Sequence, residues 1–210
     1  MIPAEVVKHN SISYPKKFKI EIDKDPFPWF ILSVLFGARI SEQIATNTYF
    51  LLQSEKLTTP ELIIERGWDG LVSILDAGGY TRYDFKTATK LLELSENLIK
   101  AGGLVNIHEN SKDFEVLVAN LKNLAKGIGD VTVGIFLREM VGIWDKAKPY
   151  PSKIVKEAAK NLGIDLFSYY KDQNISYSTL ENFLVKIGKD CIKENCKDCK
   201  VRTYCKNPKN

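Results

Sequence analysis

The sequence predicts an all-α fold in which about ten helices of modest length are joined by short loops. Hydrophobic residues recur at the i, i+3, i+4 spacing of a helix over most of the chain. Glycine and proline residues interrupt these stretches at short intervals, as expected for connecting turns. No segment of the sequence shows the alternation of apolar and polar residues that is typical of a half-buried strand, and no internal repeat is visible.

Residues 1–25 are expected to form an irregular lead-in that contains one short helix. A helical pattern then runs over residues 29–52, with a break at Gly37. The next helix should begin at Thr59-Pro60, because threonine caps helices well and proline suits the first helical position. A break is expected at Gly67 and Gly70, followed by a short helix over residues 71–75. Ser111 is the expected cap of a helix over residues 114–124. The other expected helices span residues 85–101, 131–141, 152–162 and 179–189.

Length and composition fit a globular protein of one or two domains. The 44% hydrophobic and 27% charged residues exclude disordered and collagen-like chains. The longest apolar run, residues 30–38, is far shorter than the ~20 residues of a membrane-spanning helix. The first residues lack the basic and apolar segments of a secretory signal. We therefore expect an intracellular protein, in the cytoplasm and nucleoid or in the nucleus, without a membrane partner.

All four cysteines lie close together near the end of the chain, with the spacing C-x4-C-x2-C-x5-C. Thiolates this close in sequence are typical of a metal site, since in an intracellular protein disulfides are rare. The residues themselves leave two alternatives open, a tetrahedral zinc ion and a [4Fe–4S] cluster. The expected ligands are Cys191, Cys196, Cys199 and Cys205.

The same segment carries the excess positive charge of the chain. Residues 186–210 contain eight Lys and Arg against three Asp and Glu, a net charge of +5, whereas the whole chain carries +4. Four thiolates with a metal core of charge +2 would lower this to about +3. A small, moderately basic loop of this kind is suited to phosphate contacts.

A second motif lies at residues 121–133, where two helices should meet at a turn containing Gly127 and Gly129. Glycine permits a positive φ and a close approach of the backbone. The free N–H groups at the start of the second helix can bind an anion such as a DNA phosphate. Alone, this pattern is more typical of a structural turn.

Together the two motifs resemble the helix-hairpin-helix DNA glycosylases of the endonuclease III type. Residues 124–132 resemble the family hairpin L-P-G-V-G-x-K-T-A, and the cysteines resemble its C-x6-C-x2-C-x5-C pattern with a first spacer two residues shorter. Residues 183–191 are similar to the L-x-x-x-G-x-x-x-C run before the cluster, and residues 37–42 lie where the family has S-A-Q-A-T-D. The resemblance thus covers nearly the whole chain.

The resemblance implies a [4Fe–4S] cluster, with zinc as the alternative, and a monomer that binds damaged double-stranded DNA. It implies two helical lobes with a central cleft. Residues 26–132 would form a helical barrel domain that ends in the hairpin, and residues 1–25 with 133–210 would form the cluster domain. DNA would lie across the mouth of the cleft, with an extruded base between the lobes.

The sequence departs from the family at both catalytic positions. Val131 stands where bifunctional members carry a nucleophilic lysine, and residues 149–153, with Pro151, stand where the family carries an aspartate. Nearby replacements are Asp145, which could stabilise a cationic sugar, and Lys148 or Lys153, which could act as an amine nucleophile. Three interpretations follow, in order of preference: a glycosylase or abasic-site lyase with relocated groups, a non-catalytic DNA-binding protein, or a protein for another partner such as RNA.

Two turns are candidates for DNA contact. The resemblance places Arg39 where the family inserts a glutamine into the duplex, and a guanidinium can stack on bases. The turn at residues 79–83 could supply a second probe, although its tyrosines could instead pack beneath the turn. The expected DNA contacts are Arg39, Tyr80, Arg82, Gly127, Ile128, Gly129, Val131 and Thr132. Trp29 and Trp144 are expected in the core, and His9 and His108 receive no role.

Overall fold

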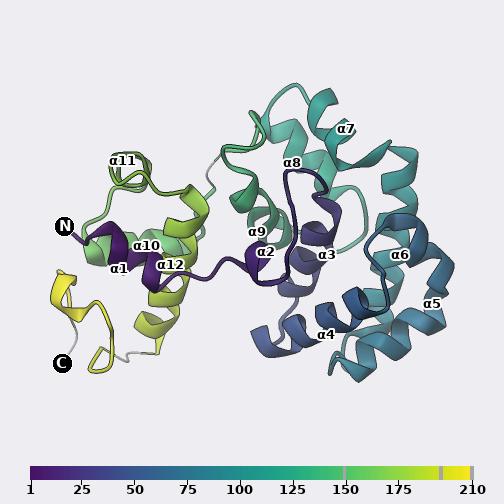
Figure 1. Ribbon diagram of the computed structural model, residues 1–210, viewed down its shortest axis with the longest axis horizontal. Coiled ribbons are helices and arrows are strands. Elements are labelled where there is room, and N and C mark those ends of the chain that lie inside the picture. Colours follow the sequence, from purple (N-terminus) through teal and green to yellow (C-terminus); the bar gives the residue numbers. More distant parts are fainter. Residues whose placement is uncertain (149, 194–195, 209–210) are drawn as a thin grey trace.

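The structure, a computed structural model, describes residues 1–148, 150–193 and 196–208 and is all-α, as predicted. The described residues form twelve α-helices and one short 3-10 helix, and no strand is found among them. The helices gather around two hydrophobic cores (Figure 1). No helix of this part of the chain is both long and apolar enough to cross a membrane.

Eight helices surround the larger core, which is drawn on the right in Figure 1. They are α2 (Tyr14–Lys17), α3 (Phe27–Phe36), α4 (Glu42–Ser54), α5 (Pro60–Ala77), α6 (Asp84–Lys100), α7 (Gly103–Asn110), α8 (Phe114–Lys122) and α9 (Asp130–Met140). Helix α3 is apolar on nearly all sides, and it lies at the centre of this group because only a buried position suits such a helix. The indole of Trp29 donates a hydrogen bond to the Phe136 carbonyl at 3.2 Å, and the rings of Phe30 and Phe136 meet edge to face. These contacts fix α9 against α3.

The smaller core joins both ends of the chain. It is formed by α1 (Ala4–His9), α10 (Lys153–Leu162), α11 (Leu166–Asp172), α12 (Tyr177–Ile192) and the 3-10 helix at Arg202–Tyr204. The Tyr169 hydroxyl donates a 2.6 Å hydrogen bond to the carbonyl of Ile2, and Val7 is fully buried. The amino-terminal helix therefore packs with the carboxy-terminal third of the chain rather than with its sequence neighbours (Figure 1).

The predicted domain boundary at residue 132 does not coincide with the boundary between the cores. It falls in the first turn of α9, whose buried residues Val133, Phe136 and Leu137 belong to the larger core. That core extends to Trp144 and Ala147, and the smaller core takes over at Val155. Trp29 and Trp144 are both buried, as expected.

Most helix boundaries follow the expected signals. Thr59 caps α5 through its hydroxyl, and Gly67 interrupts that helix with a φ of +71°, which matches the predicted break. The cap of α8 differs from the prediction. Asp113 accepts the hydrogen bond from the Val116 amide, whereas the Ser111 hydroxyl donates to the carbonyl of Ile107.

Candidate functional site

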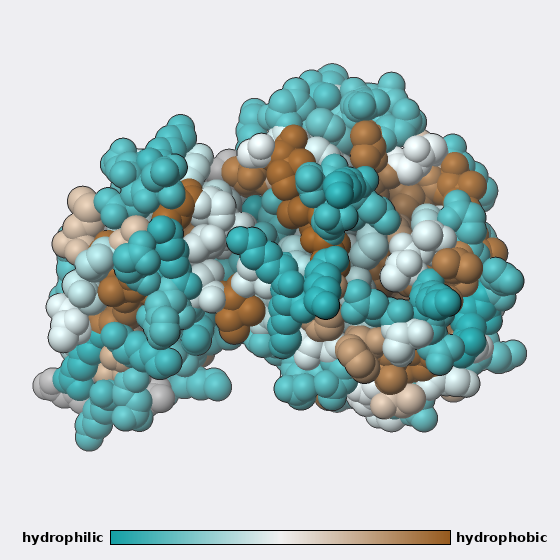
Figure 2. All heavy atoms as spheres, in the orientation of Figure 1, coloured by the Kyte–Doolittle hydropathy of each residue, from teal (hydrophilic) through white to brown (hydrophobic). Residues whose placement is uncertain are grey.

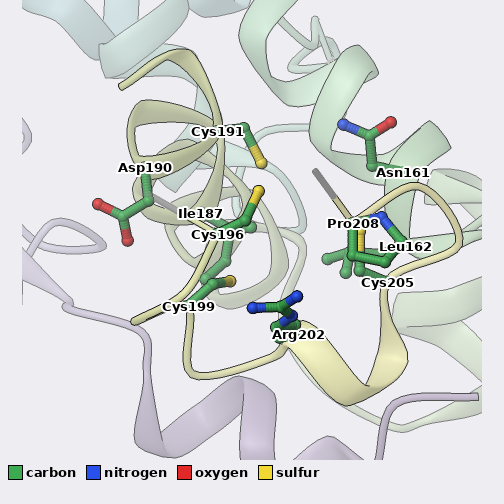
Figure 3. A pocket seen from close by; sticks show the side chains of 10 residues that line it. All are labelled: Asn161, Leu162, Ile187, Asp190, Cys191, Cys196, Cys199, Arg202, Cys205 and Pro208. Carbon is green, nitrogen blue, oxygen red and sulfur yellow. The ribbon is translucent and has the colours of Figure 1, made fainter. Parts of the chain in front are cut away.

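The four cysteines line one small cavity between α10, α12 and the segment that follows α12. Figure 3 shows the side chains of Cys191, Cys196, Cys199 and Cys205 around this space, with Asn161 and Arg202 at its edge. Burial raises the pKa of the Cys191 thiol, and the charges of the three other cysteines raise it further. Both effects favour the protonated, uncharged form of the Cys191 thiol.

Backbone hydrogen bonds between residues three positions apart form turns in the segment that carries these cysteines. The amide of Cys199 donates to the Cys196 carbonyl at 3.3 Å, and the amide of Cys205 donates to the Arg202 carbonyl at 3.0 Å. Val201 lies at the centre of the segment and is fully buried in the smaller core. The segment is thus attached to the core by an apolar side chain between its last two cysteines.

The thiols surround the cavity without converging on one point. In the part of the chain that is described, no three His, Cys, Asp or Glu side chains lie close enough together to hold a single metal ion. A lone zinc ion needs four sulfur atoms at about 2.3 Å. A four-iron cluster needs a wider arrangement, because each thiolate binds a different iron.

The predicted hairpin lies between α8 and α9. Gly127 has a φ of +88°, in the left-handed region that favours glycine, and Ile128 is buried beneath the turn. Gly129 is the N-cap of α9 and carries no side chain that could accept from the first amides of the helix. These amides and the helix dipole form the type of end that binds an anion.

Two acidic groups modify this end of the hairpin. Asp130, the first residue of α9, forms an ion pair with Lys122 at 3.0 Å. The Glu93 carboxylate accepts a hydrogen bond from the Lys126 amide at 3.0 Å. Both carboxylates oppose an incoming phosphate, so any anion bound here would depend on neighbouring lysines as well as on the helix end.

A pocket of about 790 Å³ lies beside the start of α9 and between the two groups of helices. Figure 2 shows the constriction of the molecular surface between the two groups. One wall includes Val131, which is 64% exposed, together with Ile135 and Arg138. The other wall comes from α10 and α12 and carries four lysines, Lys153, Lys156, Lys186 and Lys189.

Arg138 and Glu139 from α9 and Glu181 from α12 are buried side by side, and Asn182 from α12 is half-buried next to them. These four residues form a buried polar cluster that joins the two walls. The Asn182 amide donates to Glu139 Oε1 at 2.9 Å. Arg138 lies between the two carboxylates, 3.9 Å from Glu139 and 4.0 Å from Glu181, which is beyond hydrogen-bond distance. Arg138 and Glu181 also line the pocket.

Burial raises the pKa of the Glu181 carboxyl group, and the nearby charge of Arg138 only partly offsets this shift. Burial also raises the pKa of Tyr177, whose ring lies on the same helix, and the charge of Glu181 raises it further. A buried carboxyl group with such a shift beside a pocket is a typical feature of a functional site.

Only one of the three predicted catalytic residues lines the pocket. Lys153 is the first residue of α10 and contributes to the lysine wall, and the preceding residues Pro151 and Ser152 line the same pocket. Asp145 and Lys148 are exposed and lie outside the lining residues of the pocket. Pro149, part of the segment aligned with the family aspartate, lies outside the described residues.

Asp145 instead pairs with His108, to which no role was assigned from the sequence. Its carboxylate lies 2.7 Å from His108 Nε2, and the imidazole stacks on the Trp144 ring at 4.6 Å. Slight desolvation raises the pKa of Asp145, but the hydrogen bond to His108 and the charge of Lys146 lower it overall. This contact fixes the segment after α9 against α7.

Some of the residues predicted to contact DNA are exposed in the structure, and others are buried. Arg39 and Arg82 are exposed in their turns, and Arg82 lies over the Tyr83 ring. Tyr80 is fully buried, and its hydroxyl donates a 2.6 Å hydrogen bond to the Leu35 carbonyl, so its side chain cannot contact DNA. This is the alternative in which the tyrosine packs beneath the turn. The side chains of Ile128 and Thr132 are buried as well, which leaves their backbone for any contact.

The buried polar cluster was not predicted, although the sequence carries part of its signal. Glu181 falls on the buried face of α12, at helical spacing from Tyr177, Leu184 and Gly188. A charged residue among core positions of an amphipathic helix is a candidate for a buried functional group. Its partners on α9 are more than forty residues earlier and could not be inferred from spacing.

No protein-family model matches the sequence, and no curated protein matches it significantly.

Proposed function

We propose that this protein binds damaged duplex DNA and excises a base or cleaves at abasic sites with non-standard catalytic groups. The observation that carries the proposal is the pocket beside the start of α9, faced by four lysines on α10 and α12. A cavity of about 790 Å³ is within the range of pockets that bind small molecules and can accommodate an extruded nucleotide. The lysines would bind the flanking phosphates, and the uncapped end of α9 would bind one more.

The resemblance of residues 124–132 to the family hairpin supports the same placement of DNA. In this arrangement Arg39 is the side chain that enters the duplex, since it is exposed in the turn between α3 and α4. The neighbouring residues Phe36, Ile40 and Glu42 line the pocket. A base displaced by Arg39 would therefore have a short path into the pocket.

Salt dependence tests the DNA contact directly. If the four lysines of the pocket each neutralise one phosphate, the logarithm of the affinity should fall against the logarithm of salt concentration with a slope of about −4. The double variant Lys186→Gln/Lys189→Gln should reduce this slope by about two. Lys8→Gln on α1, which lies outside the pocket, is the matched control. A salt-independent affinity would remove phosphate contact from the proposal.

We further propose that the four cysteines bind a [4Fe–4S] cluster, with zinc as the alternative. The donor set fits, because four thiols line one cavity and thiolates are the ligands of such a cluster, as they are of zinc. Arg202 on the cavity wall would offset part of the negative charge of the thiolates. When bound, the cluster would crosslink the segment to α12 and fix its shape.

Anaerobic purification tests this assignment. The protein should be brown and contain about four iron atoms per chain. Cys199→Ser should lose the colour, whereas Lys197→Ser, between two ligands, should retain it. A colourless protein with one zinc per chain would assign the site to zinc.

The non-catalytic interpretation remains the second candidate. Two observations favour it: Val131 occupies the usual lysine position, and Asp145 lies outside the pocket and pairs with His108. A panel of duplexes with different damaged bases and an abasic site distinguishes the candidates. Borohydride trapping on the abasic duplex would identify an amine nucleophile, and Lys153→Ala should abolish the trapped adduct if Lys153 is that amine. Binding without excision or cleavage would favour the non-catalytic protein.

A further inference from the structure

The buried polar cluster is incomplete as a structural bridge between the two groups of helices. Arg138 is 9% exposed and Glu181 is 5% exposed, yet Arg138 Nε and Glu181 Oε2 have no hydrogen-bond partner within 3.5 Å among the described residues. The Tyr177 hydroxyl, which also lacks a partner at that distance, lies close enough to Glu181 to lower the pKa of its carboxyl group. Each unbonded buried group destabilises the fold by about 1–3 kcal/mol. Such groups in a pocket wall are better explained by chemistry in the pocket than by stability.

Glu181 differs from the other carboxylates that line the pocket. Glu42 and Asp130 are exposed, and Asp130 is neutralised by Lys122. Glu181 alone is buried in the wall, and its raised pKa brings the carboxyl group closer to neutral pH. A carboxyl group in this state can exchange a proton during a reaction at neutral pH.

We propose that Glu181 is the catalytic carboxylate of the base excision proposed above and that Arg138 is its positioning residue. The inference rests on that proposed function. Glu181, near the start of α12, would supply the carboxylate that is missing at residues 149–153 before α10. Arg138 lies beside Glu139, which accepts a hydrogen bond from Asn182, and would hold the Glu181 carboxylate toward the pocket.

The reaction is a hydrolysis. The oxygen of a water molecule attacks C1′ of the extruded nucleotide, and its proton passes to the Glu181 carboxylate. The bond between C1′ and the base nitrogen breaks, and its electron pair leaves with the base. The base then takes the proton from Glu181, which returns the carboxylate to its initial state. The products are an abasic sugar with a C1′ hydroxyl group and the free base.

The glutamine variant tests this role. Glu181→Gln should bind duplex DNA within about twofold of the wild type but excise the base at least about 100-fold more slowly in single-turnover experiments. Glu157→Gln, an exposed substitution of the same type on α10 outside the pocket, should leave excision unchanged. Excision by Glu181→Gln within threefold of the wild type would overturn the proposal.

The role of Arg138 is tested separately, by the pH dependence of kcat/KM. The groups that face Glu181 are Arg138 and Glu139 from α9 and Tyr177 from its own helix, and the Arg138 charge lowers the pKa of Glu181. Removing that charge in Arg138→Gln should therefore move the acidic limb of the kcat/KM profile to higher pH. A purely structural residue would lower the rate without moving this limb, and that result would overturn the positioning role.

Two further outcomes separate this inference from the proposed function. Wild-type protein that binds DNA but excises no base of the panel would overturn both the excision and the role of Glu181, and would leave DNA binding intact. Wild-type protein that does not bind DNA would overturn the proposed function itself.

Thermal unfolding identifies a variant that does not fold. If Glu181→Gln does not fold, Glu181→Asp serves as the second variant, because its side chain is shorter and withdraws the carboxylate from the pocket. Excision by Glu181→Asp at the wild-type rate would overturn the proposal.

Discussion

The buried hydroxyl of Tyr80 provides the clearest separation between a structural residue and a DNA contact. The ring is fully buried behind the turn after α5, and the hydroxyl donates to the Leu35 carbonyl at 2.6 Å. Tyr80→Phe removes this donor and leaves the ring in place. Tyr80→Ala removes both the donor and the ring.

The expected cost of Tyr80→Phe follows from the bonds that remain. The Leu35 carbonyl also accepts from the Ala38 amide at 3.3 Å, so it keeps one partner. The destabilisation should therefore lie near the lower end of the range for a lost buried hydrogen bond, about 1 kcal/mol. For a chain of this length, this corresponds to a decrease in Tm of about 2–4 °C. Tyr80→Ala should cost about 3–5 kcal/mol because it also leaves a cavity.

Chemical and thermal unfolding measure these changes, and a DNA-binding titration on the folded variants measures affinity. Tyr80→Phe should lower stability without a change in DNA affinity, with Tyr83→Phe in the same turn as the control. If Tyr80→Phe kept wild-type stability but bound DNA more weakly, the tyrosine would contact DNA and the structural argument would be wrong.

Three further predictions concern the hairpin and the buried polar cluster. Gly37→Ala should destabilise the protein by about 1–3 kcal/mol, because the new methyl group would overlap the Thr132 hydroxyl, and the added substitution Thr132→Ala should recover part of the loss in a double-mutant cycle. Asp130→Asn should strengthen duplex binding by about two- to fivefold at low salt, since it removes a carboxylate from the first turn of α9; unchanged or weaker binding would argue against a phosphate at this helix end. Glu181→Gln should stabilise the protein at pH 8, because the raised pKa means that ionised Glu181 destabilises the fold as pH rises above the unfolded-state pKa. This gain should disappear in unfolding experiments near pH 3, below the ordinary glutamate pKa of about 4.3, where the carboxyl group is protonated in both states. A gain that does not vary with pH would contradict the assignment.

The sequence predicts the helices well where local signals agree. Thr59, Pro60 and Gly67 each determine a cap or break from a few neighbouring residues, and the structure confirms them. Helices α7 and α11 were not predicted, because seven or eight residues give too short a run for a clear helical period. Both Ser111 and Asp113 have side chains that can cap α8. Asp113 is the cap in the structure, whereas the Ser111 hydroxyl donates to the Ile107 carbonyl of the preceding helix.

The site was less predictable because its contacts are distant in sequence. The four cysteines line one cavity. The catalytic candidates near Asp145 were chosen by alignment with the family motif, and spacing alone could not show that His108, on a helix well before it, would pair with its carboxylate. Likewise, only the packing of α9 against α12 brings Arg138 and Glu181 together.

The contact between the two ends of the chain has a consequence for the order of folding. The larger core uses residues from Phe18 to Ala147 and can close as soon as those residues are available. The smaller core cannot form until both ends of the chain are present, because the hydrogen bond between Ile2 and Tyr169 joins residues 167 positions apart. Closing so long a loop is entropically costly unless the larger core has already brought its ends together. Residues 2–7 should therefore remain exposed until α10 to α12 fold, and the cysteine segment should become ordered last, on a surface that the first helix of the chain completes.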